Sequence, residues 1–590
     1  MRSIHDEETL GVVFEPRLVN RLLKYLRPYR VKVVLSVILL LIIAGAEQLG
    51  PYLTKIALDN YIVPGDFDGL IAIVAMFLGL YVTLAFARVG QAVVTGWVGE
   101  KVMFDIRREV FSHLQRQTLS FFDHNPVGRL VTRNTNDVQT LSEIFSSGVV
   151  VVFGDLFMLI GIIVAMLLLN WQLAIVAVAV VPLVVWVTFS FRGRLRDVFR
   201  EVRVQTAAVN SYLQEHLSGV RIVQLFNHEK ATAKGFSGVN DHLRQDHLHT
   251  VNLFSVFFPI LEVLGAVAVA LVILRGGNLT LDGAITIGTL VAFLQYAERF
   301  FRPIRDLAEK WNIFQAGMAS AERVFDLLDT EPAIEEIDNP VKIEELDGRI
   351  EFDNVRFRYN PGDDEVLKGV DFTIEPGETA AIVGATGAGK TTIINLIGRF
   401  YDVSDGTIRM DGHDVRDLRR DDLLRDIAYV SQDIFLFSGT IRDNITLGDE
   451  FTDEHVQHAA KQVHADSFIQ RLPKGYDEEV TERGGTLSTG QRQLLSFARA
   501  MVRNPKVLVL DEATSSVDPE TEAYIQDALE VMMKGRTSII VAHRLSTVQR
   551  ADKILVMHKG TLREMGTHAE LLAQKGIYWR LFELQYRRVA

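Results

Sequence analysis

A glycine-rich run at residues 384–391 has the residue types and the spacing that a phosphate-binding loop needs. It reads Gly384-Ala385-Thr386-Gly387-Ala388-Gly389-Lys390-Thr391 and fits the pattern G-x-x-x-x-G-K-[ST]. The glycines let the backbone fold so that its N–H groups point at a phosphate chain. Lys390 is then expected to reach the β- and γ-phosphates, and the Thr391 hydroxyl to ligate Mg²⁺. The flanks fit as well, because Thr379–Val383 is typical of a short strand and Thr392–Ile397 has helical apolar spacing.

A second candidate chemical site follows a continuous apolar run further along the chain. Val507–Leu510 is expected to be a buried strand of a parallel sheet, and it leads directly into Asp511 and Glu512. A carboxylate at the end of such a strand can hold Mg²⁺ through water, so this role is expected of Asp511. Glu512 is then expected to orient and polarise an attacking water. Phosphoryl transfer needs mainly positioning and charge neutralisation, so the two runs together indicate nucleotide hydrolysis.

The chain that carries these residues changes character along its length. It has 590 residues, 48% of them hydrophobic, a formal net charge of −12 and no cysteine. The lack of cysteine excludes disulfides and thiolate metal sites, and the acidic balance argues against a general nucleic-acid binder. The first ~320 residues carry long apolar runs, whereas the remainder is typical of a charged, soluble domain.

The expected domain order follows from this change. A cytoplasmic N-terminus with an interfacial amphipathic helix covers 1–30, and an all-α transmembrane domain of six helices covers 31–325. A linker at 326–348, acidic and containing Pro332 and Pro340, separates the halves. From 349 to 590 strands and helices alternate, which predicts an α/β phosphate-loop nucleotide-binding domain with a parallel sheet and a helical subdomain. Ile350–Tyr359 is expected to belong to a small antiparallel side sheet.

Six apolar segments in the first half are long enough to cross a bilayer, which takes about 20 helical residues each. They are Val31–Leu53, Leu70–Val94, Val149–Leu169, Leu173–Phe191, Leu253–Leu274 and Ile285–Phe301. The second and fourth connections between them are long and rich in Arg and Lys, whereas the others are short. Because basic connections stay on the cytoplasmic side, both termini are expected there.

The two long connections keep a helical pattern past the expected bilayer. Each turns at a tip that mixes aromatic and polar groups, at Ser120–Gly128 and at Val220–Glu229. Such mixed surfaces are typical of protein contacts, so both tips are expected to touch the soluble half.

Several ionisable residues fall inside or beside the apolar segments. They are Glu47, Arg88, Glu262, Glu298, Arg299 and Arg302. A charge in lipid is costly, so these side chains are expected to face a wet interior or one another. A polar substrate pathway and structural ion pairs between helices are both compatible with the sequence.

A further motif completes a set that resembles the ATP-binding cassette (ABC) transporters. Leu487-Ser488-Thr489-Gly490-Gln491 is similar to their signature motif, normally L-S-G-G-Q, and it precedes the strand that ends in Asp511. The resemblance covers the whole chain and has the order of a type IV exporter half-transporter. It implies an ATPase coupled to transport, which uses ATP and Mg²⁺ and works as a dimer. Each ATP site in such a dimer joins the phosphate loop of one subunit to the signature motif of the other.

The resemblance also implies roles for single residues. Tyr359 matches the aromatic that stacks on adenine, and Gln432 matches the glutamine that contacts Mg²⁺. Asp518 matches the loop that crosses the dimer interface, and His543 matches the switch histidine at the γ-phosphate. The implied catalytic residues are Glu512, His543, Lys390 and Gln432, and the implied metal ligands are Thr391, Gln432 and Asp511. The implied nucleotide-binding residues are Tyr359, Gly384, Ala385, Thr386, Gly387, Ala388, Gly389, Lys390, Thr391, Thr392, Gln432, Asp511, Ser488, Gly490 and Asp518.

The signature departs from the family pattern in one residue. Thr489 stands where the family usually has glycine, and Thr481 likewise replaces the first glycine of V-G-E-x-G. A β-branched residue restricts the backbone and crowds a phosphate that glycine would admit. With Glu512 and His543 intact, this resembles the catalytic subunit of heterodimeric exporters, whose altered signature faces the partner's defective site. The alternative is a homodimer that tolerates the threonine.

The function expected from these features is ATP-driven export of a hydrophobic or amphipathic drug, lipid or peptide by alternating access. The partners would be a second half-transporter subunit, membrane lipids and the transported substrate, without nucleic acid. Homodimeric export and an ATP-gated channel or regulator are the alternatives. Met1–Glu15 has no signal-peptide pattern, and the short outer connections favour a bacterial inner membrane.

Overall fold

The computed structural model describes residues 16–145, 149–332, 334, 340–343, 345–481, 484–511, 519–542 and 545–586. They form two compact units. The first unit comprises Met1–Leu114 with Gly128–Thr330, and the second comprises Gln115–Val127 with Glu331–Ala590. The short segment Gln115–Val127, which contains most of the first predicted tip, therefore belongs to the second unit.

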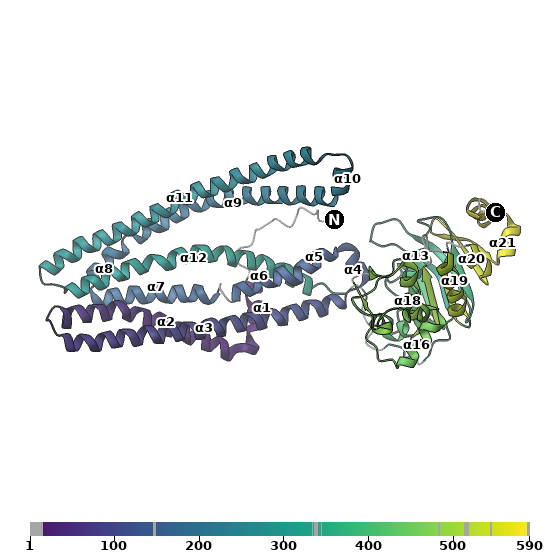
Figure 1. The fold of residues 1–590 in the computed structure, drawn as a ribbon, viewed down its shortest axis with the longest axis horizontal. Helices are drawn as coiled ribbons and strands as arrows, with labels where there is room; N and C mark the ends of the chain where they lie inside the picture. Colours follow the sequence, from purple (N-terminus) through teal and green to yellow (C-terminus); the bar gives the residue numbers. More distant parts are fainter. Residues whose placement is uncertain are drawn as a thin grey trace. The chain divides into compact units, whose positions relative to one another are not determined.

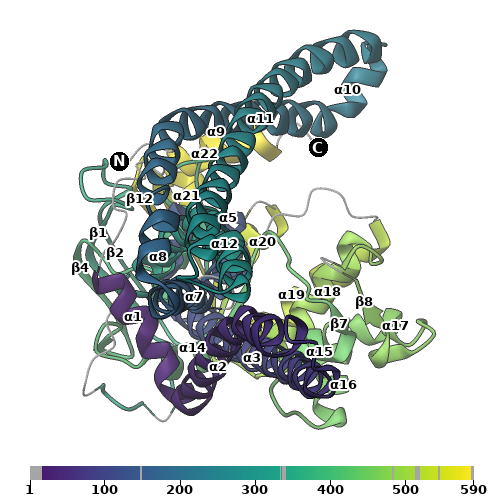
Figure 2. The ribbon, with the colours of Figure 1, turned by 90° about the vertical axis from the view of Figure 1, so that its left-hand side faces the viewer.

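The first unit is built of helices, several of them very long (Figure 1). Their bounds are α1 Pro16–Leu26, α2 Arg30–Ile56, α3 Phe67–Gln115, α5 Val127–Thr132, α6 Val138–Glu143, α7 Val149–Leu169, α8 Trp171–Val178, α9 Val181–Ser218, α10 Val220–Leu225, α11 Glu229–Leu281 and α12 Ile287–Leu328. Figures 1 and 2 show α9 and α11 running side by side to the short α10 that joins them. The prediction that the long connections continue as helices is confirmed, because α3 extends to Gln115 and α9 to Ser218.

Five helical stretches within the described residues are long and apolar enough to cross a membrane. They are Pro16–Ile62, Phe67–Gln115, Val152–Leu169, Trp171–Ser218 and Glu229–Leu281. The sixth predicted span corresponds to the first part of α12, whose apolar run is shortened by Glu298 and Arg299. The fourth span is not one continuous helix, because it breaks between α8 and α9 just before Pro182. Proline lacks an N–H donor and fits only the first turn of the new helix.

A polar network around Pro51 provides partners for three of the charged residues in the apolar segments, Glu47, Arg88 and Arg299. Pro51 lies inside α2 and leaves the Glu47 carbonyl without its helical donor. Arg299 of α12 donates to that carbonyl at 2.7 Å, while the Glu47 carboxylate pairs with Arg88 of α3. Tyr296 of α12 donates to the next carbonyl, that of Gln48, at 2.6 Å. The contacts favour a structural role for Glu47 and Arg88.

The other charges are less constrained. Glu262 and Glu298 are exposed within the chain, so both interpretations stay open for them, and the side chain of Arg302 lies outside the described part.

The second unit has the predicted α/β architecture. Its main sheet has the order β12-β11-β3-β10-β9-β6, in which only the β11–β12 pair is antiparallel. The strands are β3 Thr379–Val383, β6 Ile427–Val430, β9 Val507–Asp511, β10 Thr537–Val541, β11 Lys553–His558 and β12 Thr561–Gly566. The apolar residues of β3, β9 and β10 are buried on both faces of this sheet, as continuous hydrophobic strands predict.

Smaller sheets and helices surround it. The side sheet has the order β2-β1-β4-β5 and is antiparallel, as expected, and β7 pairs with β8. These strands are β1 Ile350–Phe357, β2 Leu367–Ile374, β4 Asp405–Met410, β5 His413–Asp414, β7 Gly439–Thr440 and β8 Glu479–Val480. The helices are α4 Leu119–His124, α13 Lys390–Ile397, α14 Arg420–Arg425, α15 Ile441–Thr446, α16 Asp453–Gln462, α17 Ala465–Ile469, α18 Thr489–Met501, α19 Pro519–Met533, α20 Leu545–Arg550, α21 His568–Gln574 and α22 Ile577–Tyr586.

Candidate nucleotide-binding site

Three parallel strands bring the two predicted chemical runs to one edge of the main sheet. β10 lies between β3 and β9, and its Val541 is level with Ile382 on one side and Asp511 on the other. The glycine-rich loop after β3 and the carboxylate at the end of β9 therefore share the carboxyl edge. Ligands of open α/β sheets bind at this edge, where strand ends leave a crevice.

The glycine-rich loop adopts a backbone that its glycines make possible. Gly387 and Gly389 have φ of +79° and +99°, values in the left-handed region. At Gly384 a Cβ atom would lie 2.3 Å from the Met557 carbonyl oxygen of β11. This clash could not be relieved by a side-chain movement, because the carbonyl belongs to the backbone. The glycine at this position is thus required by the neighbouring strand as well as by the turn.

Lys390 begins α13 directly behind the loop. Its Nζ donates to the carbonyls of Gly384 and Ala385 at 2.9 and 3.1 Å, so the side chain folds back over the loop. Lys390 is only 9% exposed, and this burial lowers the pKa of its ammonium group, while the nearby Asp511 charge acts in the opposite direction. The positive charge is therefore held where the phosphates of a nucleotide would lie.

The next two residues, Thr391 and Thr392, differ in exposure and therefore in what they can contact. Thr391 is exposed at the first turn of α13, where its hydroxyl is accessible to a metal ion. Thr392 is buried, and its hydroxyl lies 3.0 Å from the Tyr359 hydroxyl. Thr392 thus contacts the aromatic residue that the resemblance assigns to adenine.

Gln432 and Asp511 line one small cavity of about 40 Å³. Thr489 and Gln493 of α18 line the same cavity. Oxygen atoms of a hydroxyl, an amide and a carboxylate are the ligands that Mg²⁺ prefers, so Thr391, Gln432 and Asp511 have suitable chemistry for it.

The signature motif forms the exposed N-terminus of α18. The Ser488 Oγ accepts from the Gln491 N–H at 3.2 Å, and the Gln491 Oε1 accepts from the Ser488 N–H at 3.0 Å, which makes a capping box. Ser488 and Thr489 are exposed and Gly490 is buried. The helix begins at Thr489, directly after the N-cap Ser488.

The structure places Thr489 where a β-branched residue is tolerated. Thr489 is the first residue of α18 and lies in helical backbone, which any β-branched residue adopts. Its Oγ1 accepts a hydrogen bond from Arg492 at 3.2 Å. Compared with the glycine that is usual in the family, Thr489 adds the bulk of an exposed side chain at the helix N-terminus.

Three predicted site residues, Glu512, Asp518 and His543, lie outside the described residues. Their described neighbours are Asp511, the last residue of β9, and Ala542, which follows β10 at the same edge. The sequence-based assignments of Glu512, Asp518 and His543 stay predictions.

The first predicted tip contacts the nucleotide-binding unit, as expected. Asp123 of α4 accepts a hydrogen bond from the Tyr401 hydroxyl, and the His124 Nε2 lies 2.7 Å from the Asn360 Oδ1. Tyr401 and Asn360 escaped the sequence analysis, because neither belongs to a phosphate motif. The position of Asn360 directly after Tyr359 was the only available signal. The contact predicted for the second tip, at α10, stays a prediction.

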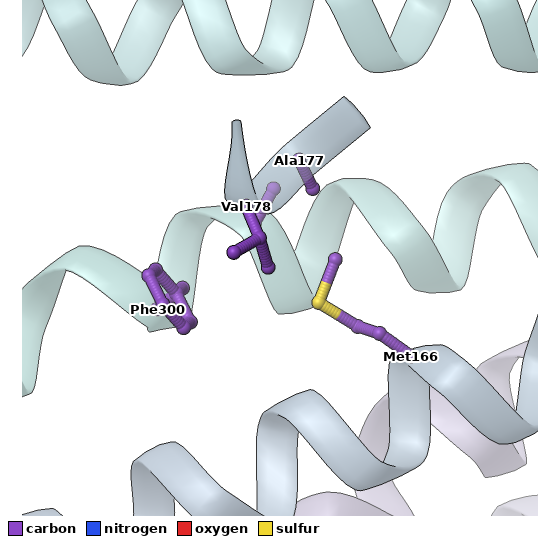
Figure 3. A pocket seen from close by; sticks show the side chains of 5 residues that line it. Met166, Ala177, Val178 and Phe300 are labelled. Atoms are coloured by element: carbon purple, nitrogen blue, oxygen red, sulfur yellow. The ribbon is translucent and has the colours of Figure 1, made fainter. Parts of the chain in front are cut away.

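An apolar crevice lies between α7, α8 and α12 in the described part of the membrane unit (Figure 3). It is lined by Met166, Ala177, Val178, Ala297 and Phe300 and has no room for a water molecule. In this conformation the crevice is a packing defect rather than a substrate chamber.

Comparisons with known proteins complete the description of the site. A family model for the ABC transporter transmembrane region matches residues 33–304, and a model described as ABC transporter matches residues 367–515. An uncharacterized ABC transporter ATP-binding protein of Bacillus subtilis is 40% identical, over 98% of this chain and 96% of its own. An ATP-dependent lipid A-core flippase of Syntrophus aciditrophicus is 37% identical, over 97% of this chain and 95% of its own. A putative multidrug export ATP-binding/permease protein of Staphylococcus aureus is 38% identical, over 96% of this chain and 100% of its own.

Proposed function

The chain belongs to the ABC transporters, as a half-transporter of the type IV exporters, and from this premise we propose the task of each of its parts. It is a multi-pass membrane protein and an ATPase coupled to transmembrane transport. We propose that it exports a hydrophobic or amphipathic drug, lipid or peptide by alternating access, as one subunit of a dimer. It is located in a bacterial plasma membrane, with both termini and the nucleotide-binding domain in the cytoplasm.

The observation that carries this proposal is the arrangement of Lys390 and Asp511. A buried lysine on a glycine-rich loop and a carboxylate meet at the carboxyl edge of one parallel sheet. The same chain carries helices long and apolar enough to cross a membrane.

In the proposed reaction the residues of this chain serve the two ATP sites of the dimer. Lys390 and the loop N–H groups bind the β- and γ-phosphates, and Tyr359 stacks on adenine. Thr391, Gln432 and Asp511 would hold Mg²⁺, which would supply positive charge beside the phosphate oxygens. Glu512 orients the attacking water, His543 contacts the γ-phosphate, and Asp518 lies at the subunit interface. Ser488, Gly490 and the α18 N-terminus bind the γ-phosphate of the partner's ATP.

Substitution of Glu512 tests the catalytic assignment. Glu512→Gln keeps the size of the side chain and removes its charge, so the magnesium-dependent ATPase rate of the assembled complex is expected to fall by about 10²-fold or more. Phosphate release from purified protein in membranes measures the rate, and binding of ATP by the variant shows that its site is intact. Wild-type turnover by a variant that binds ATP would refute the role of Glu512.

The proposed dimer is a heterodimer. Thr489 places an exposed, branched side chain at the helix N-terminus that would approach the partner's γ-phosphate, whereas Glu512 and His543 are retained. These features together suit a subunit whose own signature serves a weak site in its partner. A homodimer that tolerates Thr489 is the alternative.

Copurification distinguishes the two dimers. A tagged chain isolated from its native membrane is expected to bring a second, related half-transporter in equal amount, identified by mass spectrometry. An untagged copy of the same chain, expressed beside the tagged one, is the control. Recovery of that copy without a second subunit would establish the homodimer.

A further inference from the structure

We propose that Tyr401 is a positioning residue for adenine recognition, and that Asp123 of α4 fixes it in place. The inference rests on the proposed role of Tyr359 as the partner of the adenine ring. It assigns a function to two residues that belong to no nucleotide-binding motif of the sequence. All of them lie in the second compact unit, which includes Gln115–Val127.

Three aromatic rings pack edge to face, and one of them, Tyr359, contacts α13 through its hydroxyl. The Tyr401 ring lies 5.3 Å from the Tyr359 ring at an interplanar angle of 89°, and 5.7 Å from the Phe357 ring at 66°. The Phe357 and Tyr359 rings are 4.9 Å apart at 83°. Such perpendicular contacts are the favoured geometry for aromatic pairs. The position of Tyr359 therefore depends on where the Tyr401 ring stands.

The Tyr401 ring is in turn fixed by its hydroxyl. The residue is 8% exposed, and its hydroxyl donates to the Asp123 carboxylate. Burial and the neighbouring carboxylate raise the pKa of the Tyr401 hydroxyl well above its usual range, so it keeps the proton that it donates. A hydrogen bond to an ionised acceptor is about twice as strong as a neutral one.

Tyr359 itself is only partly covered by its neighbours. Its hydroxyl contacts the Thr392 hydroxyl of α13 at 3.0 Å, and its edge contacts come from Phe357 and Tyr401. The residue is nevertheless 37% exposed, so part of its ring stays available for a base. Tyr401 thus contacts the ring of Tyr359, and Thr392 contacts its hydroxyl.

A second contact attaches α4 next to the same tyrosine. His124 places its Nε2 2.7 Å from the Oδ1 of Asn360, the residue after Tyr359. The Asn360 Nδ2 donates to Asp363 at 2.7 Å, which fixes the orientation of the amide. Asp123 and His124 thus hold the Tyr359 segment through Tyr401 and through Asn360. We infer that α4 and a bound adenine stabilise the same arrangement of this segment, and that each favours the other by linkage.

Equilibrium binding to the full assembled complex tests the inference. Tyr401→Phe keeps the ring and removes only the hydroxyl, and Asp123→Ala removes its acceptor. Each variant is expected to weaken binding of radiolabelled ATP by about fivefold, and the double variant by no more than either alone. Asp123→Asn, whose amide oxygen still accepts the hydroxyl proton, is expected to restore most of the affinity. Inorganic tripolyphosphate, used as a competitor, should bind all variants equally because it has no base.

Tyr476→Phe provides the matched control. Tyr476 is also buried and also donates its hydroxyl to an aspartate, Asp466, at 2.7 Å, but in a different part of the unit. Removal of the Tyr476 hydroxyl is expected to leave the affinities for ATP and tripolyphosphate within about twofold of wild type. The control separates the loss of a buried tyrosine–aspartate bond in general from its loss beside Tyr359.

The Tyr359→Leu background decides whether Tyr401 acts through Tyr359. There Tyr401→Phe is expected to have no further effect on ATP binding. A fivefold effect that persists in this background, or an equal loss of tripolyphosphate binding, would mean that Tyr401 only stabilises the fold and would overturn the inference. If Tyr359→Leu itself leaves ATP binding unchanged, the adenine role in the proposed function fails instead. If Tyr359→Leu weakens ATP and Tyr401→Phe does not, only the inference fails.

Discussion

Lys390 illustrates what single residues contribute to this site. The sequence pattern identified this residue, but its side-chain conformation is set by the fold. The ammonium group bonds to the carbonyls of Gly384 and Ala385, and only 9% of the residue is exposed. A triphosphate must take over these bonds, since the carbonyls are weaker partners than phosphate oxygens.

Removal of the Lys390 charge is expected to abolish most nucleotide binding. Lys390→Ala deletes a charge-assisted contact worth about 2 kcal/mol, so the affinity for ATP should fall by about 30-fold. Equilibrium binding of radiolabelled ATP measures the change. Lys559→Ala, at a turn between β11 and β12, is the control for loss of a lysine elsewhere in the unit. Equal affinities of Lys390→Ala and wild type would contradict the proposed contact with the phosphates.

At the scale of elements, α4 is the clearest case of a segment whose role its sequence only suggested. Aromatic and polar residues at 120–128 predicted a docking tip, and the structure attaches α4 to Tyr401 and Asn360. The His124 ring has an oxygen atom near each nitrogen, Ser120 O at 2.7 Å from Nδ1 and Asn360 Oδ1 at 2.7 Å from Nε2. A neutral imidazole has one N–H and satisfies only one of these acceptors, so the pair favours the protonated ring.

The attachment of α4 should therefore depend on pH. The Ser120 carbonyl first, then Asn360, raise the pKa of His124, and the carboxylates of Asp123 and Asp363 act in the same direction. A raised folded-state pKa means that this stabilisation is fully present below the ordinary histidine pKa of about 6.5 and is lost as pH rises through the raised value. The chain has no cysteine, so a nitroxide on Val127→Cys can report the mobility of this segment.

The expected result is a label that becomes more mobile between pH 6 and pH 8.5, measured by electron paramagnetic resonance. In His124→Gln, which cannot be protonated, the spectrum should not change over that range. A pH response of equal size in both proteins would show that another group is responsible.

At the scale of the whole molecule, transport requires both the nucleotide-binding unit and the helices of the membrane unit. Helices such as α3 and α9 extend from apolar segments far into polar ones, and α3 leads directly into α4. The polar contacts around Pro51 tie α2 to α3 and α12 in the membrane unit.

Export should be visible as accumulation against a gradient. Inside-out vesicles that contain the assembled complex are expected to concentrate a fluorescent amphipathic dye or lipid when ATP and Mg²⁺ are supplied. The Glu512→Gln complex is the control that binds ATP without turnover. Downhill movement that requires ATP but never exceeds equilibrium would instead identify an ATP-gated channel.

The sequence by itself determined the family, the order of the domains, the phosphate loop and the strand that ends in Asp511. These features are local, because glycine spacing, apolar periodicity and charge act over a few residues at a time. Gly384–Thr391 could thus be read as a loop between a strand and a helix without any tertiary information.

Only the tertiary structure decided which distant residues share one place. It set β10 between β3 and β9, paired Glu47 with Arg88, and brought Asp123 to Tyr401. It also placed Thr489 in the first turn of α18, directly after the N-cap Ser488. The physical reason is that pairing across the chain depends on packing and strand register, which no local pattern of residue types encodes.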